Sequence, residues 1–287
     1  MSIDENKNLV DNTNEFYRDS QSINSNKFFQ DLIKEIEEVK TFIRDLDYLN
    51  FNRSFQIDKQ ARVFSIDHIL SSTYRTLHSI KICCECCNLA DVYILIRKYR
   101  DDLFFYLYIL CVNSNSDNGN DPKISKDEGN IIDWLNNDLS NLNINQVLSY
   151  IAKTKNVNEV MNKYKLQSSF KSINNELNNF VHANGISYYN KNYQYYNLGD
   201  KINDISEDIK YKINYITTSF LLVLILVRGD YISATDYVDN LECGYNPIEG
   251  SQYWVAPFIT EFINSRISLV SDECRAYLKE YSLMDIE

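Results

Sequence analysis

The chain has 287 residues, a formal net charge of −11 and a hydrophobic fraction of 44%, but only 7 glycines and 3 prolines. A chain of this length and hydrophobicity buries a sizeable core, which excludes a disordered protein. The acidic balance disfavours a general binder of duplex nucleic acid or of anionic membranes, and the shortage of glycine and proline favours long helices over turn-rich sandwiches and Rossmann folds.

The first residues, MSIDENKNLVDNTNEF, are polar and acidic and lack the apolar run of a secretory signal. We expect residues 1–26 to form a flexible N-terminal segment and residues 27–287 to form a single all-helical domain. The seven cysteines are an odd number and cluster at one place, which is typical of reduced thiols in a cytoplasmic protein. The longest apolar run, FLLVLILV at residues 220–227, is far below the ~20 residues of a membrane span, so it predicts a buried helix and no membrane partner.

Apolar residues recur at a spacing near 3.6 from residue 28 to residue 50, which predicts a first helix. Residues 60–112 predict the longest helical region, dividing near NLAD, where Asn88 can end one helix and Asp91 can cap the next. Further helices are predicted at residues 129–140, 144–152, 157–183, 203–228 and 257–281, the last with Pro257 in its first turn. The predicted fold class is therefore all-α, a single bundle of at least six helices, with one small β-hairpin near residues 186–197.

The string CCECC is the most conspicuous local motif, with two overlapping CxxC spacings in Cys83, Cys84, Cys86 and Cys87. Thiolates on one helix project around its circumference, whereas tetrahedral zinc needs four ligands that converge, usually from two separate elements. Cys84 and Cys87 also continue an apolar stripe, and a free cysteine packs as a small hydrophobe. We therefore expect buried thiols, with no metal and no cofactor.

The segment DVYILIRKYRDDLFFYLYIL predicts a helix with two distinct faces. One face is an ordinary apolar stripe, while the other carries Tyr93, Arg97, Arg100, Asp101, Phe104 and Tyr108. Aromatic residues around charged ones indicate a helix covered on both sides. A covered arginine needs a carboxylate, and Asp101 lies four residues after Arg97, a spacing that pairs side chains on a helix.

A polar column follows on the helix predicted before the motif ELNNFVHANG. Its members share one face at i, i+4, i+7 and i+11, and they are Lys171, Asn175, Asn178 and His182. If this column faces the two arginines and Asp101, the mixed site binds phosphate or carboxylate, and the imidazole of His182 moves a proton. Alternatively, Arg97 and Asp101 form a structural ion pair, and His182 only hydrogen-bonds a carbonyl near the helix end.

A helix bearing LIRKYRDDLF, followed by a helix ending in NNFVHANG, resembles the HEPN superfamily over about residues 60–228. The resemblance implies an all-helical and often dimeric domain, found among metal-independent ribonucleases and nucleotide-binding modules of toxin–antitoxin and phage-defence systems. In active members an arginine and a histidine act on the RNA 2′-hydroxyl and the scissile phosphate, and His182 matches that histidine. The family's arginine four to six residues before the histidine has no counterpart here; the nearest cation is Lys171, so Arg97 or Arg100 would supply the charge from the other helix.

Two functions follow. In the first, the chain is a defence or toxin-type protein that binds or cleaves RNA or a nucleotide. Its catalytic residues are His182, Arg97, Arg100 and Asp101, and its ligand-binding residues are Lys171, Asn175, Asn178, Tyr93 and Tyr108. In the second, the polar cluster is structural and the chain is a non-catalytic interaction or regulatory module, whose partner is another protein or a second copy in a homodimer.

Overall fold

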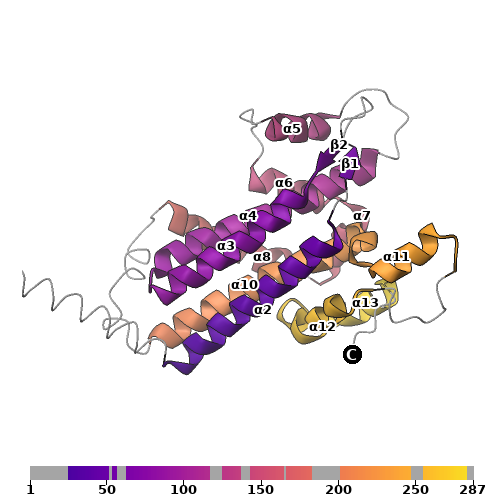
Figure 1. Cartoon of the computed structure of the whole chain (residues 1–287). Coiled ribbons are helices and arrows are strands. Elements are labelled where there is room, and N and C mark those ends of the chain that lie inside the picture. Colours follow the sequence, from indigo (N-terminus) through magenta and orange to yellow (C-terminus); the bar gives the residue numbers. More distant parts are fainter. Residues whose placement is uncertain are drawn as a thin grey trace, which may run out of the picture.

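A computed structural model describes residues 25–51, 54–56, 63–116, 125–136, 143–164, 166–182, 201–246 and 255–282. This part of the chain contains eleven α-helices, which confirms the all-α class (Figure 1). Of the predicted flexible segment, only residues 25 and 26 are described. The hairpin expected near residues 186–197 lies outside the described residues.

The helices have the following bounds: α2 (Lys27–Leu49), α3 (Asp67–Glu85), α4 (Leu89–Ser116), α5 (Lys126–Leu135), α6 (Ile144–Ile151), α7 (Lys155–Lys163), α8 (Leu166–Val181), α10 (Lys201–Val227), α11 (Thr235–Glu242), α12 (Pro257–Arg266) and α13 (Asp272–Ser282). Two short 3₁₀ turns accompany them, η2 (Gly229–Ile232) and η3 (Ile267–Leu269). The strands β1 (Ser54–Gln56) and β2 (Val63–Ser65), which follow α2 and precede α3 in the chain, form an antiparallel pair.

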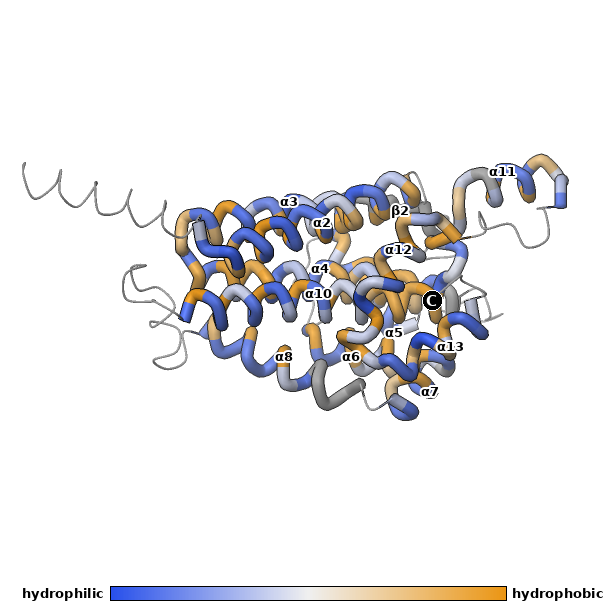
Figure 2. The backbone as a smooth tube through the Cα atoms, turned by 90° about the horizontal axis from the view of Figure 1, so that it is seen from below, coloured by the Kyte–Doolittle hydropathy of each residue, from blue (hydrophilic) through white to orange (hydrophobic). Residues whose placement is uncertain are grey.

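The long helices lie in three layers. Helices α2 and α3 form the first layer, α4 and α10 the second, and α8, α6 and α7 the third, as Figure 2 shows from below. The middle helices are covered on both sides, which explains why nearly every residue in the second half of α10 is buried. Helices α12 and α13 close one end of the bundle beside α10 (Figure 1).

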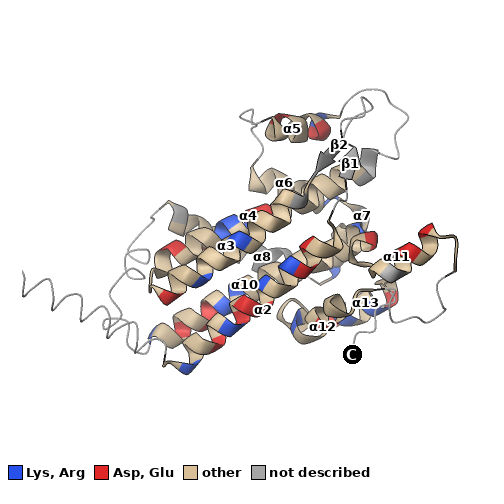
Figure 3. Cartoon of the chain, viewed as in Figure 1, with Lys and Arg blue, Asp and Glu red and all other residues tan. Residues whose placement is uncertain are grey.

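Helix α10 has the length and composition of a membrane span, but 89% of its most apolar window is buried inside the protein. Residues 213–227 contain no Asp, Glu, Lys or Arg, and Figure 3 shows the charged residues of this helix in its first half. The expectation that residues 220–227 belong to a buried helix is confirmed for residues 220–226, and Val227 is half-buried.

Local signals place the helix ends. Asn26 begins α2 by accepting a hydrogen bond from the backbone N–H of Phe29 through Oδ1 at 3.1 Å. Helix α5 begins with a capping box between Ser125 and Glu128, and α12 begins with Pro257 in its first turn, as predicted. These side chains satisfy backbone groups that a helix terminus would otherwise leave unpaired.

Several predicted boundaries are wrong. The region predicted as helical from residue 60 contains strand β2, and α3 begins only at Asp67. The long helix predicted at residues 157–183 is two helices, α7 and α8, because α7 ends at Lys163. The last predicted helix is interrupted by η3, and α11 lies between the helices predicted at residues 203–228 and 257–281, where no helix was predicted. Apolar periodicity continues across such short breaks, so it does not reveal them.

Candidate functional site

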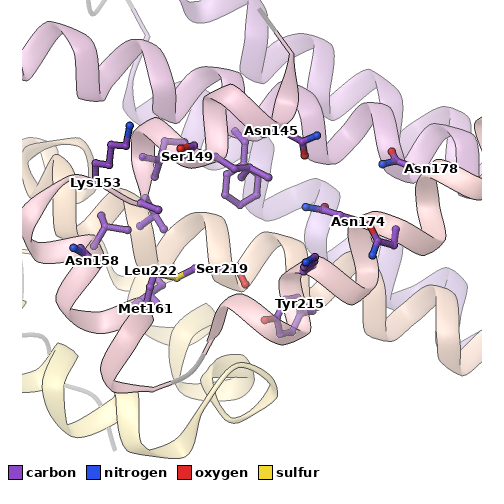
Figure 4. A pocket seen from close by; sticks show the side chains of 18 residues that line it. Asn145, Ser149, Lys153, Asn158, Met161, Asn174, Asn178, Tyr215, Ser219 and Leu222 are labelled. Carbon is purple, nitrogen blue, oxygen red and sulfur yellow. The ribbon is translucent and has the colours of Figure 1, made fainter.

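A cavity of about 740 Å³ lies between the second and third layers of the bundle, within the range of small-molecule sites (Figure 4). Helices α6, α7, α8 and α10 surround it, and α4 contributes Phe104. Its lining residues are Phe104, Asn145, Leu148, Ser149, Ile151, Ala152, Lys153, Val157, Asn158, Met161, Lys171, Asn174, Asn175, Asn178, Tyr215, Ser219, Leu222 and Val223. The described part of this lining therefore brings together five asparagines and nine apolar or aromatic side chains.

The charge of the cavity differs from that of the chain. Among the described residues, its lining contains two lysines, Lys153 and Lys171, and no carboxylate, although the chain carries a net charge of −11. Both lysines are exposed, so their ammonium groups remain hydrated at the rim. This arrangement favours a ligand with an anionic group that stays near water and a less polar part that enters the cavity.

Two polar atoms of the lining are buried and have no hydrogen-bond partner, namely Oδ1 of Asn178 and Oγ of Ser219. Ser219 as a whole is only 8% exposed and lies in the middle of α10. An unpaired buried polar atom costs about 1–3 kcal/mol, and proteins usually satisfy such atoms with water or a ligand. Ser219 and Asn178 line the cavity from two different layers, on α10 and α8 (Figure 4).

Asn174 links the cavity to the arginine cluster of α4. The Nη1 group of Arg100 donates to Oδ1 of Asn174 at 2.7 Å, while Nε and Nη2 donate to Oδ1 of Asp101 at 2.9 and 2.6 Å. Arg100 is fully buried, and burial lowers its pKa while the neighbouring charge of Asp101 raises it. The guanidinium is therefore held in place from both sides and fastens α4 to α8.

The predicted polar column is partly brought to the cavity. Lys171, Asn175 and Asn178 line it, whereas His182 does not. His182 is exposed one residue after the end of α8, and its backbone N–H donates to the carbonyl of Asn178 at 3.2 Å. It follows Asn174 by eight residues, which is roughly 12 Å along a helix axis.

The predicted catalytic set is not gathered around the cavity. Arg97, Arg100 and Asp101 do not line it, and Arg100 is sealed from solvent by the packing around it. Arg97 lies beside Asp101, with 3.7 Å between its Nε and Oδ2 of the carboxylate, which is an ion pair without a short hydrogen bond. The carboxylate instead makes its short contacts with Arg100, because that side chain is the one with no access to water.

The two tyrosines predicted to bind a ligand are core residues. Tyr93 is fully buried, stacks on Phe180 and donates its hydroxyl to Oδ2 of Asp208 at 2.5 Å. Burial is the main reason that the pKa of Tyr93 is raised. Tyr108 is also buried and donates to Oδ1 of Asp127 at 3.0 Å. Neither hydroxyl lines the cavity.

The cysteine motif ends α3. Cys84 is buried, as predicted, and burial raises the pKa of its thiol, whereas Cys86 is exposed. Cys87 has a left-handed backbone with φ 59°, and the N–H groups of Cys87 and Asn88 donate to the carbonyls of Cys84 and Cys83. This is the Schellman pattern, in which glycine usually takes the place of Cys87. Within the described residues, no group of three His, Cys, Asp or Glu side chains lies close enough to hold a metal ion.

Sequence reasoning missed several lining residues. Asn174 lies three residues after Lys171 and four before Asn178, so the same helical spacing would have found it. Asn145 and Ser149 of α6 and Ser219 of α10 carry no comparable signal, because only packing brings their helices together. Comparison with protein-family models, with curated proteins and with solved structures found no match to this chain.

Proposed function

We propose that this chain is a nucleotide-binding helical protein that takes a single nucleotide or an RNA end in the cavity and does not cleave it. The observation that carries the proposal is a cavity whose described lining has two lysines, five asparagines and no carboxylate, within a strongly acidic chain. A nucleotide is also the ligand class that the resemblance to the HEPN superfamily implies.

The chemistry of the lining supports each part of such a ligand. Side-chain amides offer a donor and an acceptor side by side, which matches the edge of a nucleobase. The nine apolar or aromatic side chains of the lining, Phe104 and Tyr215 among them, give a heterocycle an apolar wall. The ammonium groups of Lys153 and Lys171 at the rim favour the phosphate.

The arrangement of the predicted catalytic groups supports binding rather than cleavage. Each of the three guanidinium nitrogens of Arg100 donates to Asp101 or Asn174, and the residue is fully buried, so a phosphate from solution does not reach it. His182 is exposed and outside the cavity lining. In this proposal the arginine cluster is therefore structural.

Calorimetry of the purified full chain tests the proposal. We expect AMP, GMP, CMP or UMP to bind with one-to-one stoichiometry and to remain intact, and ribose 5-phosphate and inorganic phosphate to bind at least tenfold more weakly because they leave the apolar part of the cavity empty. Absence of heat with all four nucleotides and with a short single-stranded RNA contradicts the proposal, and appearance of cleaved RNA contradicts the non-catalytic part.

Two variants connect binding to the cavity. Asn178→Leu preserves the size of the side chain but removes the amide, so we expect a loss of affinity of roughly tenfold, about 1.4 kcal/mol. Asn179→Leu is the matched control, since Asn179 is exposed on the same helix and does not line the cavity. Equal affinities for the two variants would place the nucleotide elsewhere.

A further inference from the structure

Asn174 has a defined amide orientation. A guanidinium carries only hydrogen-bond donors, so the atom that faces Nη1 of Arg100 at 2.7 Å must be the amide oxygen. The amide nitrogen then occupies the other branch of the side chain, away from the guanidinium. Because Arg100 is immobilised by two further hydrogen bonds to Asp101, the orientation of Asn174 is set before any ligand arrives.

Asn178 presents the complementary group one helical turn later. Its Oδ1 is buried and has no partner, and Asn174 is itself only 9% exposed. Side chains four residues apart on a helix are neighbours, with about 5–6 Å between their Cβ atoms. The wall formed by α8 therefore carries a donor and an unpaired acceptor next to each other, on the same side of the cavity in Figure 4. A rotation of the partly exposed Asn178 side chain turns this acceptor toward a bound base.

We infer that the nucleotide enters base first, and that Asn174 and Asn178 read the Watson–Crick edge of the base, with Arg100 acting as the positioning residue for Asn174. This inference rests on the proposed function. Each ordinary base carries an acceptor beside a donor on that edge: O6 and N1–H in guanine, O4 and N3–H in uracil, N1 and the 6-amino group in adenine. A carboxylate or phosphate carries acceptors only and would meet the Oδ1 atom of Asn178 unfavourably.

The unpaired hydroxyl of Ser219 completes the inner end. Ser219 lies on α10, across the cavity from α8, and a hydroxyl both donates and accepts. The hydroxyl can therefore hydrogen-bond, as donor or acceptor, to a polar atom of the base other than the two that Asn174 and Asn178 contact. The lysines lie on α8 and on the segment after α6, both exposed, which leaves the sugar and phosphate toward solvent.

The substitution Asn174→Asp tests the inference without disturbing the arginine. An aspartate still accepts from Arg100, but its second oxygen turns the donor on the cavity side into an acceptor. The protein then presents two acceptors, so the base must present two adjacent donors on its Watson–Crick edge. Guanine supplies them through N1–H and its 2-amino group. Inosine monophosphate lacks that amino group and adenine has an acceptor at N1.

We expect wild-type protein to bind GMP and inosine monophosphate with affinities within about threefold of each other. In Asn174→Asp the ratio of the two affinities should rise to about tenfold in favour of GMP, and AMP should weaken by at least tenfold, as one bidentate base contact is worth about 1–3 kcal/mol. Asn179→Asp is the matched control, with the same change of charge at an exposed position on α8 outside the cavity lining. Its ratio should stay at the wild-type value.

The outcomes separate the two proposals. If wild-type protein binds nucleotides but Asn174→Asp weakens GMP, inosine monophosphate and AMP by one common factor, the base-first reading is overturned and nucleotide binding stands. If wild-type protein binds no nucleotide, both fail. The thermal midpoint of each variant is measured beside binding. If Asn174→Asp does not fold, 1-methylguanosine monophosphate tests the inference with the wild-type protein: replacing N1–H by a methyl group should weaken binding at least about tenfold relative to GMP, and an equal affinity overturns the base-first reading.

Discussion

Asp101 accepts two hydrogen bonds from its sequence neighbour Arg100, at 2.9 and 2.6 Å, rather than from Arg97 one helical turn earlier. The pairing follows exposure: the Arg100 side chain is fully buried, while that of Arg97 is 26% exposed. A buried cation needs a partner more than one that water still reaches.

Arg100→Ala is therefore expected to destabilise the protein by about 3–5 kcal/mol, since it leaves Asp101 and the Oδ1 atom of Asn174 without their donor. Arg97→Ala is the matched control on the same helix, with an expected loss below about 1 kcal/mol. Urea denaturation followed by circular dichroism measures both. Similar losses for the two variants would contradict a structural role specific to Arg100.

Tyr93→Phe is expected to destabilise the fold by about 1–2 kcal/mol, because Asp208 loses the hydroxyl donor while the stack on Phe180 remains. The same carboxylate also pairs with the buried Lys212, so the remaining network keeps one cation. Tyr48→Phe, at a residue that is 75% exposed, serves as control and should change stability by less than about 0.5 kcal/mol. Nucleotide affinity should be unchanged in both variants. A loss of nucleotide affinity in Tyr93→Phe would show that Tyr93 contributes to nucleotide binding.

Cys87→Gly is expected to stabilise the protein by about 0.5–1 kcal/mol. The backbone of Cys87 has φ 59°, a conformation that costs a residue with a Cβ atom more than it costs glycine. Cys86→Gly is the neighbouring control, because Cys86 has φ −90° and gains nothing from the change. A higher thermal midpoint for Cys86→Gly than for Cys87→Gly would refute this explanation of the turn.

Buried thiols give the protein a pH-dependent stability in the alkaline range. Burial raises the pKa of Cys274 to about 11 and that of Cys111 to about 12. The folded state thus binds these protons more tightly than the unfolded state does. Their contribution to the free energy of unfolding is complete below the unfolded pKa of about 8.5 and is lost as the pH rises through the folded values.

Urea midpoints measured from about pH 8 to about pH 11 should consequently fall. Cys274→Ala should reduce the fall, since it removes one of the groups that release protons on unfolding. Cys243→Ala, at an exposed cysteine, should leave the profile as it is in the wild type. An unchanged slope in Cys274→Ala would show that other groups produce the alkaline loss.

The sequence alone determined that this protein is helical and roughly where its helices lie. The apolar spacing from residue 28 to residue 50 matches α2 within one residue at each end, and Pro257 marks the start of α12. The crowding of aromatic residues around Arg97 and Arg100 indicated a helix covered on both sides, as α4 is. Such signals are local, because periodicity and capping depend on residues a few positions apart.

Only the tertiary structure decided which polar groups meet. The spacing on α8 identified Lys171, Asn175 and Asn178, all of which line the cavity, but included His182, which does not. The spacing did not indicate that Arg100 would donate a hydrogen bond to Asn174, 74 positions away. Nor did it indicate that Ser219 of α10 would line the same cavity as α8. These pairings depend on how the helices of three layers rotate and pack together, and that is decided by burial across the whole core rather than by any one segment.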